Sequence, residues 1–183
     1  PQALGLGHAV LCAKPVVGDN PFSVILADDL IDGEPATKEM AEVYASRGGS
    51  VLGVENVLPA DTGSYGILDA DAISDDLLKV NSMVEKPKPE DAPSTLAVVG
   101  RYILTPRIFD CLEKVQPGRG GEIQLTDGIS DLMAFEDVFA YRFSGKRFDC
   151  GSKLGFMKAN VELALQHPDI NQQFSEYLKS LPL

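Results

Sequence analysis

Short apolar runs, separated by helix-like patterns, set the limits on what this chain can fold into. Residues 22–27 and 96–104 are rich in aliphatic and β-branched residues and are short enough to predict buried strands. Residues 37–47 and 153–166 instead have the composition and boundary signals of helices. This alternation predicts an α/β domain in which helices flank a mixed, mostly parallel central sheet.

The length and composition of the chain indicate one folded domain, residues 1–183, with a sizeable core. It is 44% hydrophobic and 23% charged, which are ordinary values for a globular protein. A formal net charge of −11 argues against nucleic acid or an anionic membrane as a partner, because both require clustered lysine and arginine. No run of about 18 apolar residues predicts a membrane span. An anionic ligand would therefore need a local basic group or a metal ion.

The three cysteines, Cys12, Cys111 and Cys150, are widely scattered, and the sequence contains no Cys-x-x-Cys pair. This pattern predicts neither a zinc site nor a disulfide framework. Reduced thiols are typical of cytoplasmic proteins, so a cytoplasmic location is predicted.

Two opposite charges and a proline end one of the predicted strands. Residues 83–87 are Met-Val-Glu-Lys-Pro. Pro87 cannot donate to a sheet, so it predicts that the strand ends and that Glu85 and Lys86 lie together at its tip. Strand tips are where α/β folds place their ligands. We therefore predict that Glu85 binds ligand hydroxyls and Lys86 an anionic group; the alternative is a surface strand end with two solvated charges.

Aspartates mark the ends of two predicted extended segments. Asp28 and Asp29 come directly after residues 22–27, and Asp149 ends a short extended piece that precedes the helix at 153–166. Carboxylate oxygens suit Mg²⁺, which typically takes one or two carboxylates together with substrate phosphates. Asp28 is the better candidate because it is nearer the strand, and Asp29 is predicted to be solvated. A plain loop junction for Asp28 and a helix cap for Asp149 are the alternatives.

Glycines occupy three positions where a ligand could approach the backbone. Gly5 precedes a predicted helix, where amides can meet a phosphate or a base edge, although a plain helix start is an equal alternative. Gly66 and Gly100 interrupt predicted strands and indicate close approach of a ligand, with a β-bulge as the alternative at Gly66. Residues 69–71, Asp-Ala-Asp, resemble a phosphatase nucleophile loop but lack its remaining residues, so we predict a hairpin turn there.

Seven short motifs follow one another along the chain, namely GLGHAV (5–10), VILAD (24–28), SYGI (64–67), VEKP (84–87), VGRY (99–102), GEIQLTD (121–127) and FDCGSKLG (148–155). Taken together, these motifs resemble the bacterial UTP–glucose-1-phosphate uridylyltransferase family, within the sugar nucleotidyltransferase superfamily. The resemblance covers essentially the whole chain and preserves the order of the motifs.

The resemblance implies a Rossmann-like nucleotide-diphospho-sugar transferase fold. It also implies a Mg²⁺-dependent reaction in which UTP and glucose 1-phosphate give UDP-glucose and pyrophosphate. The site roles that it implies are Gly5 against the uracil, Asp28 and Asp149 on Mg²⁺, Glu85 on the glucose hydroxyls, Lys86 on the sugar phosphate, and Gly66 and Gly100 beside the sugar. Asp28 and Lys86 would be the catalytic residues. Arg119 and Cys150 receive no role.

The sequence departs from the family pattern in two places. The family's N-terminal Gly-x-Gly-Thr-Arg phosphate loop is absent from the 183 residues, so we expect a C-terminal part of the domain that is inactive or unfolded when isolated. Asp29 stands where the family typically has valine, and it could compete for the metal ion.

Three further expectations concern assembly and the alternatives. The helical segment 152–183 is expected to pack on the parent domain or on a second subunit, giving a homo-oligomer such as a dimer or tetramer. A related sugar nucleotidyltransferase that uses dTTP is one alternative function. A non-catalytic module that binds a nucleotide sugar is the other.

Overall fold

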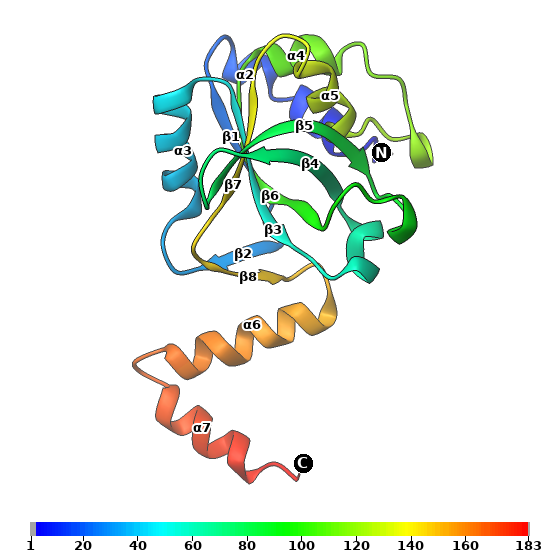
Figure 1. Cartoon of the computed structure of the whole chain (residues 1–183). Coiled ribbons are helices and arrows are strands. Elements are labelled where there is room, and N and C mark those ends of the chain that lie inside the picture. Colours follow the sequence, from blue (N-terminus) through cyan, green and yellow to red (C-terminus); the bar gives the residue numbers. More distant parts are fainter. Residues whose placement is uncertain (1–2, 183) are drawn as a thin grey trace.

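The computed structural model describes residues 3–182, which form a six-stranded sheet, a two-stranded sheet and seven α-helices (Figure 1). The strands are β1 (Phe22–Ile25), β2 (Asp29–Asp32), β3 (Ser50–Asn56), β4 (Gly66–Ala72), β5 (Leu77–Glu85), β6 (Leu96–Leu104), β7 (Val138–Arg142) and β8 (Lys146–Asp149). The α-helices are α1 (Leu6–Leu11), α2 (Lys14–Val17), α3 (Ala36–Arg47), α4 (Arg107–Leu112), α5 (Leu125–Leu132), α6 (Lys153–Gln166) and α7 (Asn171–Ser180). Short 3₁₀ helices are η1 (Pro59–Ser64), η2 (Pro89–Asp91) and η3 (Arg119–Gly121).

The larger sheet has the strand order β1-β6-β3-β7-β5-β4, and β6 also pairs with β4. The mixed α/β architecture is confirmed, but the prediction of a mostly parallel sheet is wrong. Among the described strands only β3 and β7 pair in parallel, whereas every other pairing is antiparallel. Apolar runs indicate that a strand is buried on both faces, but they carry no information on its direction. Here β4 and β5 form a hairpin, and β6 lies antiparallel between β1 and β3.

Helices cover both faces of the six-stranded sheet. On one face Met40 of α3 packs against Val51 of β3. On the other face Leu52 joins a core that includes Ile108 of α4 and Ile129 of α5. Successive strand residues point to opposite faces, so neighbours such as Val51 and Leu52 belong to different cores. This double burial accounts for the continuous apolar runs in the sequence.

Two local predictions are wrong. Residues 22–27 were expected to be buried, but β1 alternates between half-buried and exposed side chains, and Ile25 is 54% exposed. Residues 69–71 were expected to form a turn, yet they lie within β4. The turn of this hairpin comes later, where the amide of Ile73 donates to the carbonyl of Leu77 at 2.8 Å.

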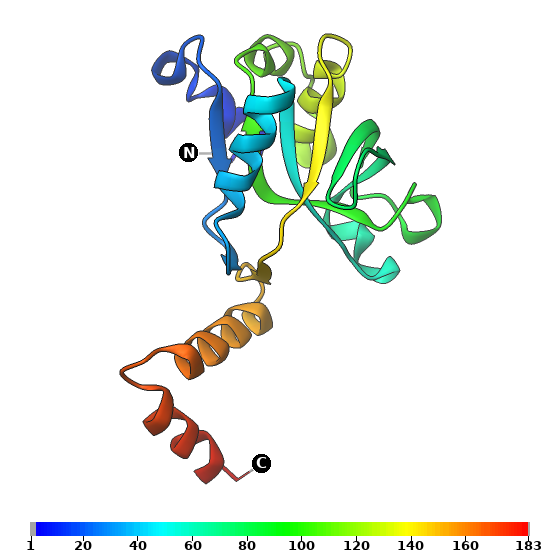
Figure 2. The same cartoon turned by 60° about the vertical axis from the view of Figure 1, so that its left-hand side comes forward.

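The C-terminal helices extend away from the sheets. Figures 1 and 2 show α6 leaving the end of β8, with α7 beyond it. Ser152 caps α6 by accepting the amide of Gly155 at 3.0 Å. Ala159 is the only residue of α6 that is buried, and Leu154 and Met157 are more than half exposed. None of the helices in residues 3–182 has the length and apolarity needed to cross a membrane.

Candidate functional site

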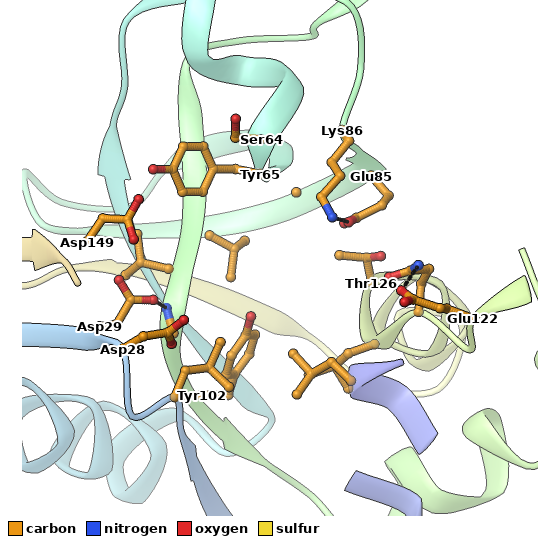
Figure 3. A pocket seen from close by; sticks show the side chains of 18 residues that line it. Asp28, Asp29, Ser64, Tyr65, Glu85, Lys86, Tyr102, Glu122, Thr126 and Asp149 are labelled. Atoms are coloured by element: carbon orange, nitrogen blue, oxygen red, sulfur yellow. Dashed lines mark hydrogen bonds and ion pairs between the residues drawn. The ribbon is translucent and has the colours of Figure 1, made fainter. Parts of the chain in front are cut away.

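A cavity of about 380 Å³ lies where β5, β6, β8 and the start of α5 approach one another. Its size suits a small ligand. Six of the seven predicted site residues line this cavity, namely Asp28, Gly66, Glu85, Lys86, Gly100 and Asp149. Figure 3 shows the aspartates on one side of the cavity, with Glu85 and Lys86 on the other. The seventh residue, Gly5, is next to Leu6, which lines the cavity.

The chain turns sharply at the tip of β5, as the proline predicted. Lys86 follows the last residue of the strand and has a φ of 46°, in the left-handed region. The amide of Lys86 donates to the carbonyl of Tyr65 at 2.9 Å. The Nζ atom of Lys86 lies 3.4 Å from Oε1 of Glu85, so the two side chains share the cavity instead of facing opposite sides of the sheet.

The pairing of β2 with β8 brings Asp28 and Asp149 together. In this ladder Asp29 stands opposite Asp149, and the amide of Cys150 donates to the carbonyl of Asp28 at 2.7 Å. A Cβ atom placed on Gly151 would lie 2.9 Å from Oδ2 of Asp28 and 3.1 Å from Oδ1 of Asp149. The two carboxylates are therefore close neighbours, although they are 121 positions apart in the chain.

The donor set at this end of the cavity fits a magnesium ion. Within residues 3–182, no three His, Cys, Asp or Glu side chains gather closely enough to hold a metal by themselves. Mg²⁺ does not require such a cage, because it commonly takes one or two carboxylates and completes its shell with water and phosphate oxygens. Asp28 and Asp149 offer hard oxygen ligands that face an open cavity.

Asp29 is buried, so the prediction of a solvated side chain is wrong. The residue is 8% exposed, and its Oδ2 atom accepts the amide of Gly100 at 2.8 Å. Its Oδ1 atom accepts from Nε of Arg147. Both carboxylate oxygens therefore have protein partners, which leaves Asp28 as the aspartate of this pair that is available to a ligand. No local pattern in the sequence indicates this burial, because Arg147 is 118 positions away.

Arg147 is the central member of a buried polar network that sequence reasoning missed. Its side chain is only 6% exposed, and Nη1 lies 2.5 Å from Oε1 of Glu55 and 3.5 Å from the hydroxyl of Tyr65. Its guanidinium carbon is 5.3 Å from the centre of the Tyr65 ring. Burial lowers the pKa of Arg147, but hydrogen bonds to Tyr65, Asp29 and Glu55, together with the negative charge of Asp29, raise the pKa above its ordinary value. The guanidinium is therefore permanently charged.

Protein atoms already crowd the three predicted glycines. A Cβ atom on Gly100 would lie 2.4 Å from Oδ2 of Asp29, and one on Gly66 would lie 2.9 Å from Cγ2 of Thr126. Gly5 has a φ of 94°, and its Cβ would lie 2.6 Å from the carbonyl oxygen of Ile123. Close packing within the protein thus accounts for all three glycines, and their contacts with a ligand stay predictions.

Thr126 was also missed by sequence reasoning, although it belongs to one of the motifs. It lines the cavity near Gly66, at the start of α5. Its Oγ1 atom is buried and has no hydrogen-bond partner among the described residues. A buried hydroxyl without a partner is unfavourable for folding, and because this atom is closed to solvent, a ligand would bond to it only after the wall beside it moves.

Comparison with known proteins gives relatives of known activity. The sequence matches the family model described as Nucleotidyl transferase over residues 1–166. A UTP–glucose-1-phosphate uridylyltransferase from Pseudomonas aeruginosa is 50% identical over 158 residues, which are 85% of this chain and 57% of that protein.

Solved structures support the same relationship. The UTP-bound UGPase from Acinetobacter baumannii has a TM-score of 0.88 and 42% identity, and the match covers 100% of this chain and 64% of that one. A UDP-glucose pyrophosphorylase complexed with UDP-glucose has a TM-score of 0.87 and 40% identity, covering 91% of this chain and 64% of that one. The chain thus spans between 57% and 64% of the length of these three proteins. Because the family model matches most of the sequence, and the similar proteins agree with the resemblance found in the motifs, the chain belongs to the nucleotidyl transferase family.

Proposed function

We propose that the protein transfers a uridylyl group from UTP to glucose 1-phosphate, forming UDP-glucose and releasing pyrophosphate. The names and bound ligands of the similar proteins support this activity. The observation that carries the proposal is the division of one cavity into two charged ends. Lys86 stands at one end, and Asp28 and Asp149 stand at the other.

The reaction requires one new phosphorus–oxygen bond and the loss of another. A phosphate oxygen of glucose 1-phosphate attacks the α-phosphorus of UTP in line, and the bond to the β-phosphate breaks as pyrophosphate leaves. No covalent enzyme intermediate is needed, so the protein contributes mainly positioning and charge neutralisation. Lys86 would offset the repulsion between the two anionic substrates as they approach.

Asp28 and Asp149 would hold Mg²⁺ at the nucleotide end of the cavity. When bound, the ion would polarise a phosphate oxygen and offset negative charge. The protein positions one of these ligands directly, because Oδ1 of Asp149 accepts the amide of Gly151 at 3.0 Å. That bond leaves the second carboxylate oxygen of Asp149 available for coordination.

The other end of the cavity would bind the sugar. Glu85 is a hydrogen-bond acceptor for glucose hydroxyls, and its side chain is only 19% exposed. The hydroxyl of Thr126, which has no hydrogen-bond partner within residues 3–182, would offer a second polar contact once a ligand opens the wall beside it. Gly66 keeps the wall between these residues free of a side chain. Lys86 would then contact the phosphate on the same sugar.

The test is a product assay on the full-length protein with Mg²⁺, glucose 1-phosphate and either UTP or dTTP. We expect pyrophosphate release and UDP-glucose formation, with UTP as the better nucleotide. A preference for dTTP would instead establish the thymidylyltransferase alternative. Binding of UDP-glucose, with neither pyrophosphate release in the forward direction nor UTP formation from UDP-glucose and pyrophosphate in the reverse direction, would identify a nucleotide-sugar-binding module and overturn the proposal.

We also propose that the protein is a cytoplasmic homo-oligomer assembled through its C-terminal helices. Phe156 and Met157 on α6 and Tyr177 on α7 are each more than half exposed, which supports a covering partner. The three free thiols suit a reducing compartment. Light scattering on the full-length protein tests the assembly. Replacing Phe156 and Met157 together by Ser should reduce the measured mass to that of one chain, and an unchanged mass would remove these helices from the interface.

A further inference from the structure

Arg147 contacts three parts of the molecule that are far apart in the sequence. It lies on β8, in the two-stranded sheet that carries Asp28 and Asp149 next to its ends. Its guanidinium contacts Asp29 of β2, Glu55 at the end of β3, and Tyr65 just before β4. Arg147 therefore connects the small sheet to the larger sheet and to the wall of the cavity.

The register of the small sheet explains how Arg147 reaches Asp29. Ile31 stands opposite Arg147, and Asp29 stands opposite Asp149. Asp29 and Arg147 are thus diagonal neighbours on one face, at the spacing where long side chains interact. Because Asp29 directly follows Asp28, and Asp149 lies two residues after Arg147, the ion pair fixes the backbone beside both predicted metal ligands.

Asp29 continues this connection into the larger sheet. Its second carboxylate oxygen accepts the amide of Gly100 on β6 at 2.8 Å. Its main-chain carbonyl accepts from Nη2 of Arg101 at 2.6 Å. The small sheet is therefore tied to β6 through Asp29 and to β3 through Glu55, with Arg147 bonded to both carboxylates.

Arg147 itself does not line the cavity, so it is not placed to contact a substrate. Its charge is fully engaged by two carboxylates and an aromatic face. We propose that Arg147 is a positioning residue, which sets the separation of Asp28 and Asp149 from each other and from the cavity wall, and so sets the affinity of the metal site. This inference rests on the proposed function, because that function supplies the metal ion.

The test is Arg147→Lys in the full-length protein, with Mn²⁺ as the probe. Lysine keeps one positive charge but cannot bond Asp29, Glu55 and Tyr65 at the same time. Free and bound Mn²⁺ are measured by electron paramagnetic resonance in the presence of UDP-glucose, independently of turnover. We expect the Mn²⁺ dissociation constant to rise about tenfold to a hundredfold, the usual effect of removing a group that orients metal ligands. The KM for glucose 1-phosphate should stay within about twofold of the parent value.

Lys146→Gln is the matched control. Lys146 neighbours Arg147 on β8, but its side chain is 59% exposed and its ion pair is with Glu162 on the surface. Exposed pairs contribute little, so Mn²⁺ affinity should not change. A folded Arg147→Lys protein with the parent affinity for Mn²⁺ would show that Arg147 has only a structural role, and would overturn the proposal.

If Arg147→Lys fails to fold, Glu55→Gln tests whether the contacts of Arg147 set the affinity for Mn²⁺. It removes one of the two charges that hold Arg147, while the pair with the more buried Asp29 stays intact. A rise in the Mn²⁺ dissociation constant supports the proposal, and an unchanged constant overturns it. The proposed function and the positioning role of Arg147 can also be refuted separately. If the parent protein forms no UDP-glucose, the proposed function fails, but the effect of these variants on Mn²⁺ binding is still measured.

Discussion

The amide of Gly100 donates to Oδ2 of Asp29 at 2.8 Å, and a Cβ atom on residue 100 would lie 2.4 Å from that same oxygen. The glycine is therefore required by a neighbouring carboxylate. Asp29 in turn is held by the buried Arg147 and stands beside the predicted metal ligand Asp28. A single close contact thus connects β6, which is predicted to border the sugar, to the end of the cavity that would hold the metal ion.

This contact predicts that Gly100→Ala destabilises the protein. The added methyl group would push β2 away from β6 or break the hydrogen bond to Asp29. We expect the free energy of unfolding to fall by about 1–3 kcal/mol, as for overpacking in a well-filled interior. Urea denaturation measures it. Gly63→Ala is the control, because the nearest atom to its Cβ is 3.6 Å away. Equal effects of the two substitutions would contradict the proposed crowding at Gly100.

Sequence reasoning located the tip of β5 correctly because its signals are local. Pro87 ends the strand, and the two charges that precede it then share one cavity. Asp29 was mispredicted for the opposite reason. Its partners, Gly100 and Arg147, are 71 and 118 positions away, and no local pattern shows that the fold brings them to a buried carboxylate.

The same distinction applies to the fold as a whole. The bounds of α6 were predicted without error, because a serine cap and a following proline mark both ends of that helix in the sequence. The direction of β6 was not predicted. Its antiparallel position between β1 and β3 depends on long-range pairing, and the apolar run at residues 96–104 would look the same in either direction.

Lys86→Ala should lower activity far more than stability. The ammonium group has no protein partner besides Glu85 among the described residues, and its side chain is 41% exposed, so few packing contacts are lost. We expect kcat/KM for glucose 1-phosphate to fall about a hundredfold or more, as when a group that neutralises developing charge is removed. Steady-state kinetics test this. Lys79→Ala, which breaks an exposed ion pair with Asp137, should leave the rate unchanged. A parent-like rate for Lys86→Ala would remove this residue from the mechanism.

Lys86→Gly should be equally inactive but more stable than Lys86→Ala. Residue 86 has a φ of 46°, where side chains other than glycine cost about 1 kcal/mol or more. Glycine relieves that cost, whereas alanine retains it. We expect urea denaturation to show a difference of about 1 kcal/mol in favour of glycine. If alanine were the more stable residue, the left-handed conformation of Lys86 would have to be abandoned.

Asp149→Asn should remove metal-dependent activity without unfolding the protein. The amide oxygen of asparagine can still accept the hydrogen bond from Gly151, so the turn before α6 is retained. The negative charge offered to Mg²⁺ is lost. We expect the rate at saturating substrate to fall at least about a hundredfold, with an unchanged melting temperature. Asp71→Asn changes an exposed carboxylate on β4 and is the control. A parent-like rate and Mg²⁺ dependence in Asp149→Asn would exclude Asp149 as a ligand.

Thr126→Val should stabilise the protein and weaken the binding of glucose 1-phosphate. The Oγ1 atom of Thr126 is buried without a partner among residues 3–182, so replacing the hydroxyl by a methyl group removes a polar atom that folding leaves unsatisfied. Removing such an atom should raise the free energy of unfolding by about 1 kcal/mol. If a glucose hydroxyl bonds to this atom in the complex, its loss should raise KM about tenfold.

Thr62→Val is the matched control for this prediction. Thr62 is 1% exposed, but its hydroxyl donates to the carbonyl of Pro59 at 2.9 Å. The same chemical change should therefore lower stability by about 1 kcal/mol and leave KM unchanged. Denaturation measures the free energy of unfolding of both variants, and steady-state kinetics measures their KM. The two changes in stability have opposite signs only if the two hydroxyls differ in their partners. A loss of stability in Thr126→Val together with an unchanged KM would mean that its hydroxyl is satisfied within the protein, and that the sugar does not use it.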